Sequence, residues 1–213
     1  MALFLIELRI LFIVMLAELY NSISKRNFIR LYTIEYFLDF QCNQIAKYLR
    51  KSLKLKIHHT IYEELVVITR IQKGGGLGDI YKKIVSDKKI LTLSTSIFDF
   101  RSLEQKGFLK EIGYEKTSIF GMIPRIKKMV GYISNDSLKK IYILNEPCDP
   151  LIYISYLIYS RNFKNFVFYH HADHTFCFGA LEKRWTHIDL FQNQYQICKK
   201  KLKPIFNSMI NFL

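Results

Sequence analysis

The feature that most constrains this chain is a series of short, predominantly apolar runs separated by segments of helical periodicity. The run at 65–69 reads Leu-Val-Val-Ile-Thr, and the later runs are equally rich in β-branched and aromatic residues. Runs without alternation are typical of strands that are buried on both faces, as in a parallel sheet. We therefore predict strands at 65–69, 89–94, 117–120, 140–144, 165–169 and 186–191, with helices at 80–85, 101–106, 123–133 and 151–159.

Strands that alternate with helices indicate right-handed crossovers and helices on both faces of the sheet. The predicted fold class is α/β, a Rossmann-like doubly wound parallel sheet preceded by an α-helical N-terminal section. Residues 3–56 contain no Gly or Pro and have helical spacing, which defines that section. The expected domains are a helical section at 1–60, a Rossmann-like domain at 61–197 and a basic and apolar tail at 198–213.

The net charge of the chain indicates which kinds of partner it can be expected to bind. Its 32 Lys and Arg residues against 18 Asp and Glu give a net charge of +14, which favours an anionic partner. The basic residues are scattered and lack the aromatic and glycine signatures of a nucleic-acid module, so we expect no nucleic-acid binding. The four cysteines show neither CxxC pairs nor the spacing of a secreted disulfide scaffold, which indicates a protein of the reducing cytoplasm.

The first apolar segment does not read as a membrane span. Glu7, Arg9 and Glu18 interrupt it, so no stretch of about 20 apolar residues remains to cross a bilayer. We interpret it as a buried or interfacial helix, and a membrane-associated anchor is the alternative. The excess of basic residues agrees with a cytoplasmic protein in peripheral contact with the inner membrane.

Ligands of open parallel sheets bind beyond the carboxyl ends of the strands, which directs attention to two loops. The first contains Gly74, Gly75 and Gly76, whose backbone can pass close to a ligand at a helix N-terminus. Its spacing matches neither the dinucleotide fingerprint nor the P-loop, and a flexible turn is the alternative interpretation.

The second loop carries His170, His171, Asp173 and His174 after the strand at 165–169. Histidine and carboxylate side chains at such a position can bind a metal, transfer protons or hold hydroxyl groups, although some of them could simply cap a helix. The motif of zinc hydrolases, His-x-His-x-Asp-His, is broken because Tyr169 occupies its first position. We therefore expect no metal ligand here, and a zinc-dependent hydrolase remains an alternative.

The order of these elements, with His171-Ala172-Asp173-His174 followed by Phe176 and Gly179, resembles the N-terminal domain of bacterial glycosyltransferases of the GT-B class. The resemblance runs from about Glu64 to Leu190. Two positions depart from the family: Leu77-Gly78-Asp79 replaces His-Thr-Arg, and Cys177 replaces a large aromatic residue.

The resemblance implies transfer of a sugar from a nucleotide-sugar donor to a glycan-type acceptor, without a tightly bound cofactor. His171 or His174 would be the catalytic base, oriented by Asp173. Substrate would contact Gly74, Gly75, Gly76, Asp149 and His170.

In GT-B enzymes a C-terminal domain holds most of the nucleotide, and this sequence does not contain one. We therefore expect a truncated or split enzyme whose missing half comes from a second chain. A non-catalytic partner subunit or remnant is the alternative.

Overall fold

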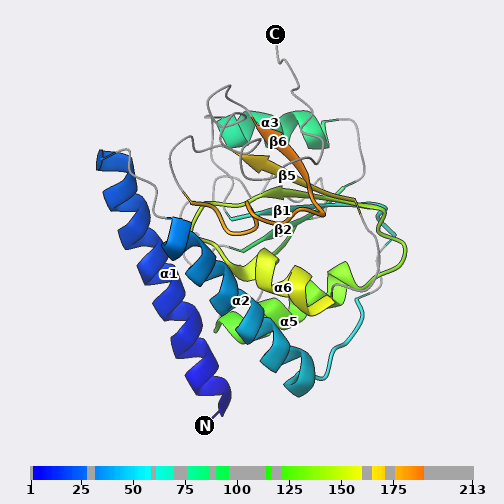
Figure 1. Ribbon diagram of the computed structural model, residues 1–213. Helices are drawn as coiled ribbons and strands as arrows, with labels where there is room; N and C mark the ends of the chain where they lie inside the picture. Colours follow the sequence, from blue (N-terminus) through cyan, green and yellow to red (C-terminus); the bar gives the residue numbers. More distant parts are fainter. Residues whose placement is uncertain are drawn as a thin grey trace.

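The computed structural model describes residues 2–27, 32–58, 61–69, 76–86, 90–95, 114–116, 121–159, 165–170 and 176–189. Its centre is a six-stranded, wholly parallel sheet with the order β3-β2-β1-β4-β5-β6 (Figure 1). This is the order of a Rossmann-type doubly wound sheet, so the predicted fold class is confirmed. The strands are β1 (Glu64–Ile68), β2 (Leu91–Ser94), β3 (Tyr114–Lys116), β4 (Lys140–Leu144), β5 (Asn165–His170) and β6 (Thr186–Asp189).

The alternation of side chains along each strand divides the core into two layers. Leu65 and Val67 of β1 point to the face covered by α5 (Met122–Ile133) and α6 (Leu151–Tyr159). Val66 and Ile68 point to the opposite face, which is covered by α3 (Gly76–Val85). β1, β4 and β5 are buried on both faces over most of their length, which explains why their sequences are mostly apolar.

Two N-terminal helices, α1 (Ala2–Asn27) and α2 (Tyr32–Ser52), extend the layer formed by α5 and α6 (Figure 1). α2 packs on α6, and α1 packs on α2 and α5. One stripe of α1 is buried in the same core cluster as the sheet, and it consists of Ile6, Ile10, Ile13, Ala17 and Tyr20. The helical section and the sheet therefore share one hydrophobic core.

Polar contacts fix α1 at both ends. The Glu7 carboxylate accepts hydrogen bonds from the backbone N–H groups of Met122 (2.9 Å) and Ile123 (2.8 Å), and so caps the N-terminus of α5. Near the other end of α1, the Asn21 side chain accepts a bond from Phe176 N (2.8 Å) and donates one to Phe176 O (3.0 Å). α1 thus connects the start of α5 to the segment that precedes β6.

The structure adjusts several predicted boundaries. Helix was predicted through residue 56, but α2 ends at Ser52 and residues 53–58 are not helical. The helix predicted at 80–85 begins earlier, at Gly76. The predicted strand at 117–120, the helix at 101–106 and the tail at 198–213 lie outside the described residues, and the described strand nearest to 117–120 is β3. Among the helices described, none is both long and apolar enough to cross a membrane.

Candidate functional site

A row of polar side chains crosses the carboxyl edge of the sheet. Ile68 of β1 pairs with Ser94 of β2 and with Leu144 of β4, so the next residues, Thr69, Thr95 and Asn145, lie side by side. The same register, carried from β4 to β5, places His170 beside Asn145. Alternation puts all four side chains on the face of α5 and α6. We call Thr95, Thr69, Asn145 and His170 the edge row.

The edge row spans the point where the strand order reverses. β2 and β3 lie on one side of β1, whereas β4, β5 and β6 lie on the other. The crevice at such a switch point is the usual ligand site of doubly wound sheets. Thr69, which follows β1, and Asn145, which follows β4, lie next to this switch point.

Asp149 organises one half of the edge row. One of its carboxylate oxygens accepts a hydrogen bond from Thr69 Oγ1 (2.8 Å) and another from the Thr95 hydroxyl. The other oxygen accepts a bond from the backbone N–H of Leu151 (3.0 Å), the first residue of α6. Loss of hydration raises the pKa of Asp149, against the lowering effect of these bonds and of the Arg125 charge. The carboxylate thus joins the ends of β1 and β2 to the start of α6.

Arg125 of α5 places a buried positive charge beneath the same strands. Its Nη1 donates to the carbonyl oxygen of Thr95 (2.8 Å), and the residue is 1% exposed. Burial lowers the pKa of Arg125, while the charges of Asp149 and Glu7 raise it. A guanidinium keeps its charge even so, so this end of the sheet contains a fixed cation.

Asn145 differs from its neighbours in the edge row. It is 3% exposed, and neither its amide nitrogen nor its amide oxygen has a hydrogen-bond partner in the part of the chain that the structure describes. A buried polar group without a partner costs about 1–3 kcal/mol. Such a group at a switch point has the chemistry needed to donate to, and accept from, a bound ligand.

His170, at the other end of the edge row, contacts a second histidine. Its Nε2 lies 2.7 Å from Nδ1 of His187 on β6, and His187 Nε2 lies 2.8 Å from the carbonyl oxygen of Glu182. Burial lowers the pKa of His187, while the Glu182 carbonyl and charge raise it. Since the Glu182 carbonyl only accepts, we infer that His187 Nε2 carries the proton and that His170 Nε2 donates to His187 Nδ1.

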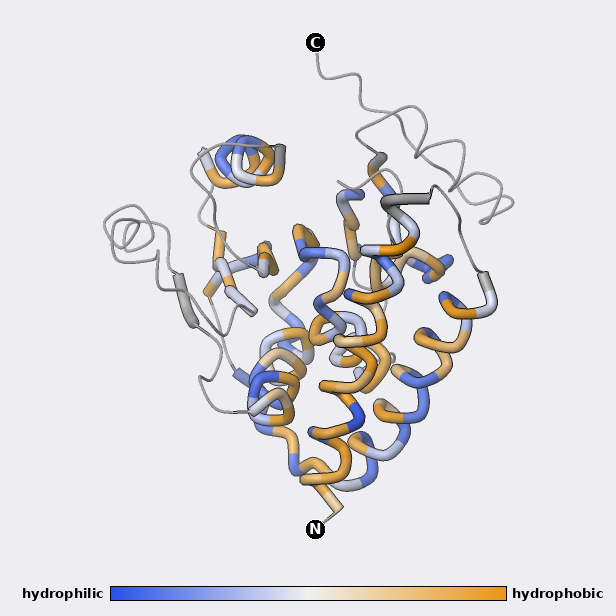
Figure 2. Tube along the Cα trace, turned by 90° about the vertical axis from the view of Figure 1, so that its left-hand side faces the viewer, coloured by the Kyte–Doolittle hydropathy of each residue, from blue (hydrophilic) through white to orange (hydrophobic). Residues whose placement is uncertain are grey.

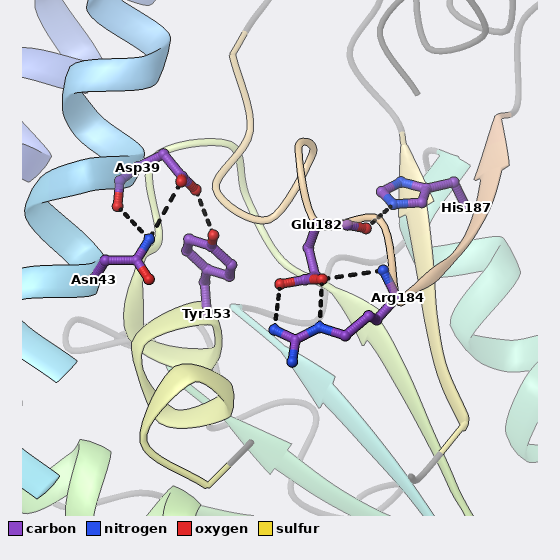
Figure 3. A network of polar contacts seen from close by, with 6 residues as sticks. All are labelled: Asp39, Asn43, Tyr153, Glu182, Arg184 and His187. Atoms are coloured by element: carbon purple, nitrogen blue, oxygen red, sulfur yellow. Dashed lines mark hydrogen bonds and ion pairs between the residues drawn. The ribbon is translucent and has the colours of Figure 1, made fainter. Parts of the chain in front are cut away.

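A further group of polar contacts joins α2 to α6 (Figure 3). The Tyr153 hydroxyl of α6 donates to the carboxylate of Asp39 on α2, whose side chain also accepts a bond from Asn43 (3.3 Å). Burial raises the pKa of Asp39. The Asp39 carboxylate accepts bonds from two side chains of the protein, which indicates a structural function.

A second, separate group of contacts lies beside Trp185. The Arg184 guanidinium forms a two-point ion pair with Glu182 (2.8 and 2.9 Å) and lies 5.0 Å from the centre of the Tyr156 ring. Burial raises the pKa of Tyr156 to about 12. Trp185 is buried against Tyr156 and Phe166, with ring centres 5.0 and 5.8 Å away. These contacts pack the segment before β6 against α6 and β5.

The predicted site residues fall into two groups. Asp149 and His170 lie at the carboxyl edge as expected, and the backbone of Gly76 begins α3. Gly74, Gly75, His171, Asp173 and His174 lie outside the described residues. The roles assigned to all of them stay predictions.

Sequence analysis missed four residues of this site: Thr69, Thr95, Asn145 and Arg125. The signal for three of them was present, because each is the polar residue at the end of a buried apolar run. Arg125 carried no such signal, since a basic residue on a helix ordinarily faces water.

The described residues contain no group of three His, Cys, Asp or Glu side chains that could hold a metal ion. The histidine loop of the zinc-hydrolase alternative lies outside them. No protein-family model matches the chain, and neither a curated protein nor a solved structure shows significant similarity to it.

Proposed function

We propose that this chain is the acceptor-side, Rossmann-like half of a glycosyltransferase of the GT-B class, and that its edge row binds saccharide hydroxyl groups. The observation that carries the proposal is the buried amide of Asn145, which faces no protein partner among the described residues at the switch point of the sheet. An amide both donates and accepts hydrogen bonds, as does a hydroxyl group. An amide that can both donate and accept hydrogen bonds suits a sugar better than a purely anionic ligand, which only accepts them.

The surroundings of Asn145 support the same ligand class. Asp149 and Arg125 bind Thr69 and Thr95 at the ends of β1 and β2, so we expect this part of the edge row to be held in position before a ligand arrives. A rigid site loses less conformational entropy on binding. The carboxylate of Asp149 is occupied by protein donors, and we assign it a positioning function.

His170 ends β5 beside Asn145, and the histidine loop follows it in the sequence. We assign His171 or His174 the role of base toward the acceptor hydroxyl, with Asp173 orienting it. The base takes the hydroxyl proton, the oxygen bonds to the anomeric carbon, and the bond from that carbon to the nucleotide diphosphate breaks. The donor nucleotide is expected to bind to a second domain or chain.

Calorimetric titration of the purified chain tests this proposal. One series uses oligosaccharides and their lipid-linked forms, and the other uses nucleotide sugars. The proposal predicts saturable binding in the first series and none in the second. Binding of nucleotide sugars alone would contradict the acceptor-side assignment, and absence of binding in both series would contradict a saccharide site.

A further inference from the structure

The outer surface of α1 is mostly apolar between Leu3 and Ile23. The helix has 26 residues, about 39 Å at 1.5 Å per residue. Met15 is 70% exposed and Phe4 64% exposed, and both belong to a continuous set of exposed apolar side chains. That set, which we call the outer face of α1, consists of Leu3, Phe4, Leu5, Leu8, Leu11, Phe12, Met15, Leu19 and Ile23.

α2 continues this surface with aromatic side chains. Tyr36, Phe37, Phe40 and Tyr48 are exposed on it. Figure 2 shows α1 in front, mostly orange, with α2 beside it. A contiguous apolar surface of this extent is rare on an isolated soluble protein and marks an interaction site.

Basic side chains lie at one end of the surface. α1 and α2 run antiparallel, because Arg9 bonds to Gln41 (2.8 Å) and Tyr20 bonds to Glu35 (3.0 Å). The first turns of α1 therefore lie beside the last turns of α2, as Figures 1 and 2 also show. Exposed cations gather there and in the segment that follows, namely Lys47, Lys51, Lys54 and Lys56.

Acidic groups are scarce on the same surface. Of the carboxylates whose side chains are described in residues 2–58, Glu18 alone is exposed. Glu7 is bound to the start of α5, Glu35 is buried, and Asp39 is bonded to Tyr153. The surface therefore combines apolar and positively charged groups.

We propose that α1 and the adjoining end of α2 dock on an anionic lipid membrane, with α1 lying flat in the interface. An interfacial helix combines a buried apolar face with basic residues that attract anionic headgroups. No described helix is suited to cross the bilayer, which agrees with a helix that lies on its surface. A second copy of the chain fits less well, because it would bring the same lysines and a net charge of +14 against them.

This inference does not depend on the proposed function. The test is co-sedimentation of the full chain with vesicles of phosphatidylcholine alone, or of phosphatidylcholine mixed with phosphatidylglycerol. We expect binding to the mixed vesicles and at least tenfold weaker binding to phosphatidylcholine, with salt weakening the former.

Two variants separate the apolar and electrostatic contributions. Phe12→Ser with Met15→Ser removes two exposed apolar side chains and is expected to weaken binding roughly a hundredfold, about tenfold for each. Lys47→Gln, Lys51→Gln and Lys54→Gln together are expected to weaken binding to the mixed vesicles roughly a hundredfold, about fivefold for each lysine.

The matched control is Lys82→Gln with Lys83→Gln on α3, which covers the other face of the sheet. It should bind like the wild type. All the substituted side chains are exposed, and circular dichroism would verify that each variant is folded. Equal loss of binding in the α3 control would overturn the proposal. Wild-type affinity of the serine variant for the mixed vesicles would also overturn it. A third contrary result would be a wild-type protein that forms a dimer, binds no vesicles and becomes monomeric when the two serines are introduced.

Discussion

Gly179 is a position where the structure predicts a large effect from adding a single carbon atom. Its φ angle is +88°, in the left-handed region that favours glycine. A Cβ atom added there would lie 2.2 Å from Cζ3 and 2.7 Å from Cη2 of Trp185. Trp185 is 1% exposed and packed among aromatic rings, so its indole cannot move aside. We therefore expect Gly179→Ala to destabilise the fold severely.

The expected magnitude has two parts. The left-handed conformation costs an alanine roughly 1–2 kcal/mol. Overpacking against a fixed indole adds roughly 1–3 kcal/mol. The free energy of unfolding should fall by about 2–5 kcal/mol, which is a large part of the 5–15 kcal/mol typical of a folded domain.

Denaturant titration of a double-mutant cycle separates the two parts. Trp185→Leu removes the ring that the new Cβ would meet, so Gly179→Ala in that background should cost only the conformational strain. The coupling free energy between the two positions is then about 1–3 kcal/mol. If Gly179→Ala cost the same in both backgrounds, the contact with Trp185 would not be the cause and the packing described here would be wrong.

Two more predictions concern the N-terminal helix and the histidine pair. Glu7→Ala removes the cap of α5 and should lower the free energy of unfolding by about 1 kcal/mol or more. The control is Glu63→Ala, which breaks an exposed ion pair with Lys139 and should change the free energy of unfolding by less than about 1 kcal/mol. Because burial lowers the pKa of His187 below its ordinary 6.5, stability should be highest above that pH and fall as the pH drops below it, by at most about 1.4 kcal/mol per pH unit. His187→Gln should flatten the fall in denaturant titrations between pH 7.5 and 5, and an unchanged slope would contradict this assignment.

Several strands and helices were predictable because a segment that is buried on both sides appears in the sequence as a run of apolar residues. Lys140–Leu144 and Leu151–Tyr159 were predicted to the residue, since each apolar run is bounded by turn residues or charges. Two interacting helices without Gly or Pro were predicted as one section, and the end of α2 was placed four residues too late because Leu53 and Leu55 continue the apolar pattern.

The candidate site was only partly predictable. That ligands bind at the strand ends follows from the fold class, but the edge row depends on register between strands that lie far apart in the sequence. Thr69 and Thr95 look like ordinary turn residues until the sheet aligns them on Asp149. That the Asn145 amide has no partner among the described residues is likewise a property of three-dimensional packing, which no local pattern encodes.

Asn145→Leu tests the central claim most directly, because it gives opposite results for a ligand-binding and a structural amide. A leucine removes a buried polar group that has no partner among the described residues, so the free protein should become more stable by about 1–3 kcal/mol. Saccharide binding should be lost at the same time. Asn165→Leu, at the exposed opposite end of β5, serves as the control and should leave binding unchanged. A less stable Asn145→Leu protein that still binds saccharide like the wild type would contradict a ligand site at the edge row.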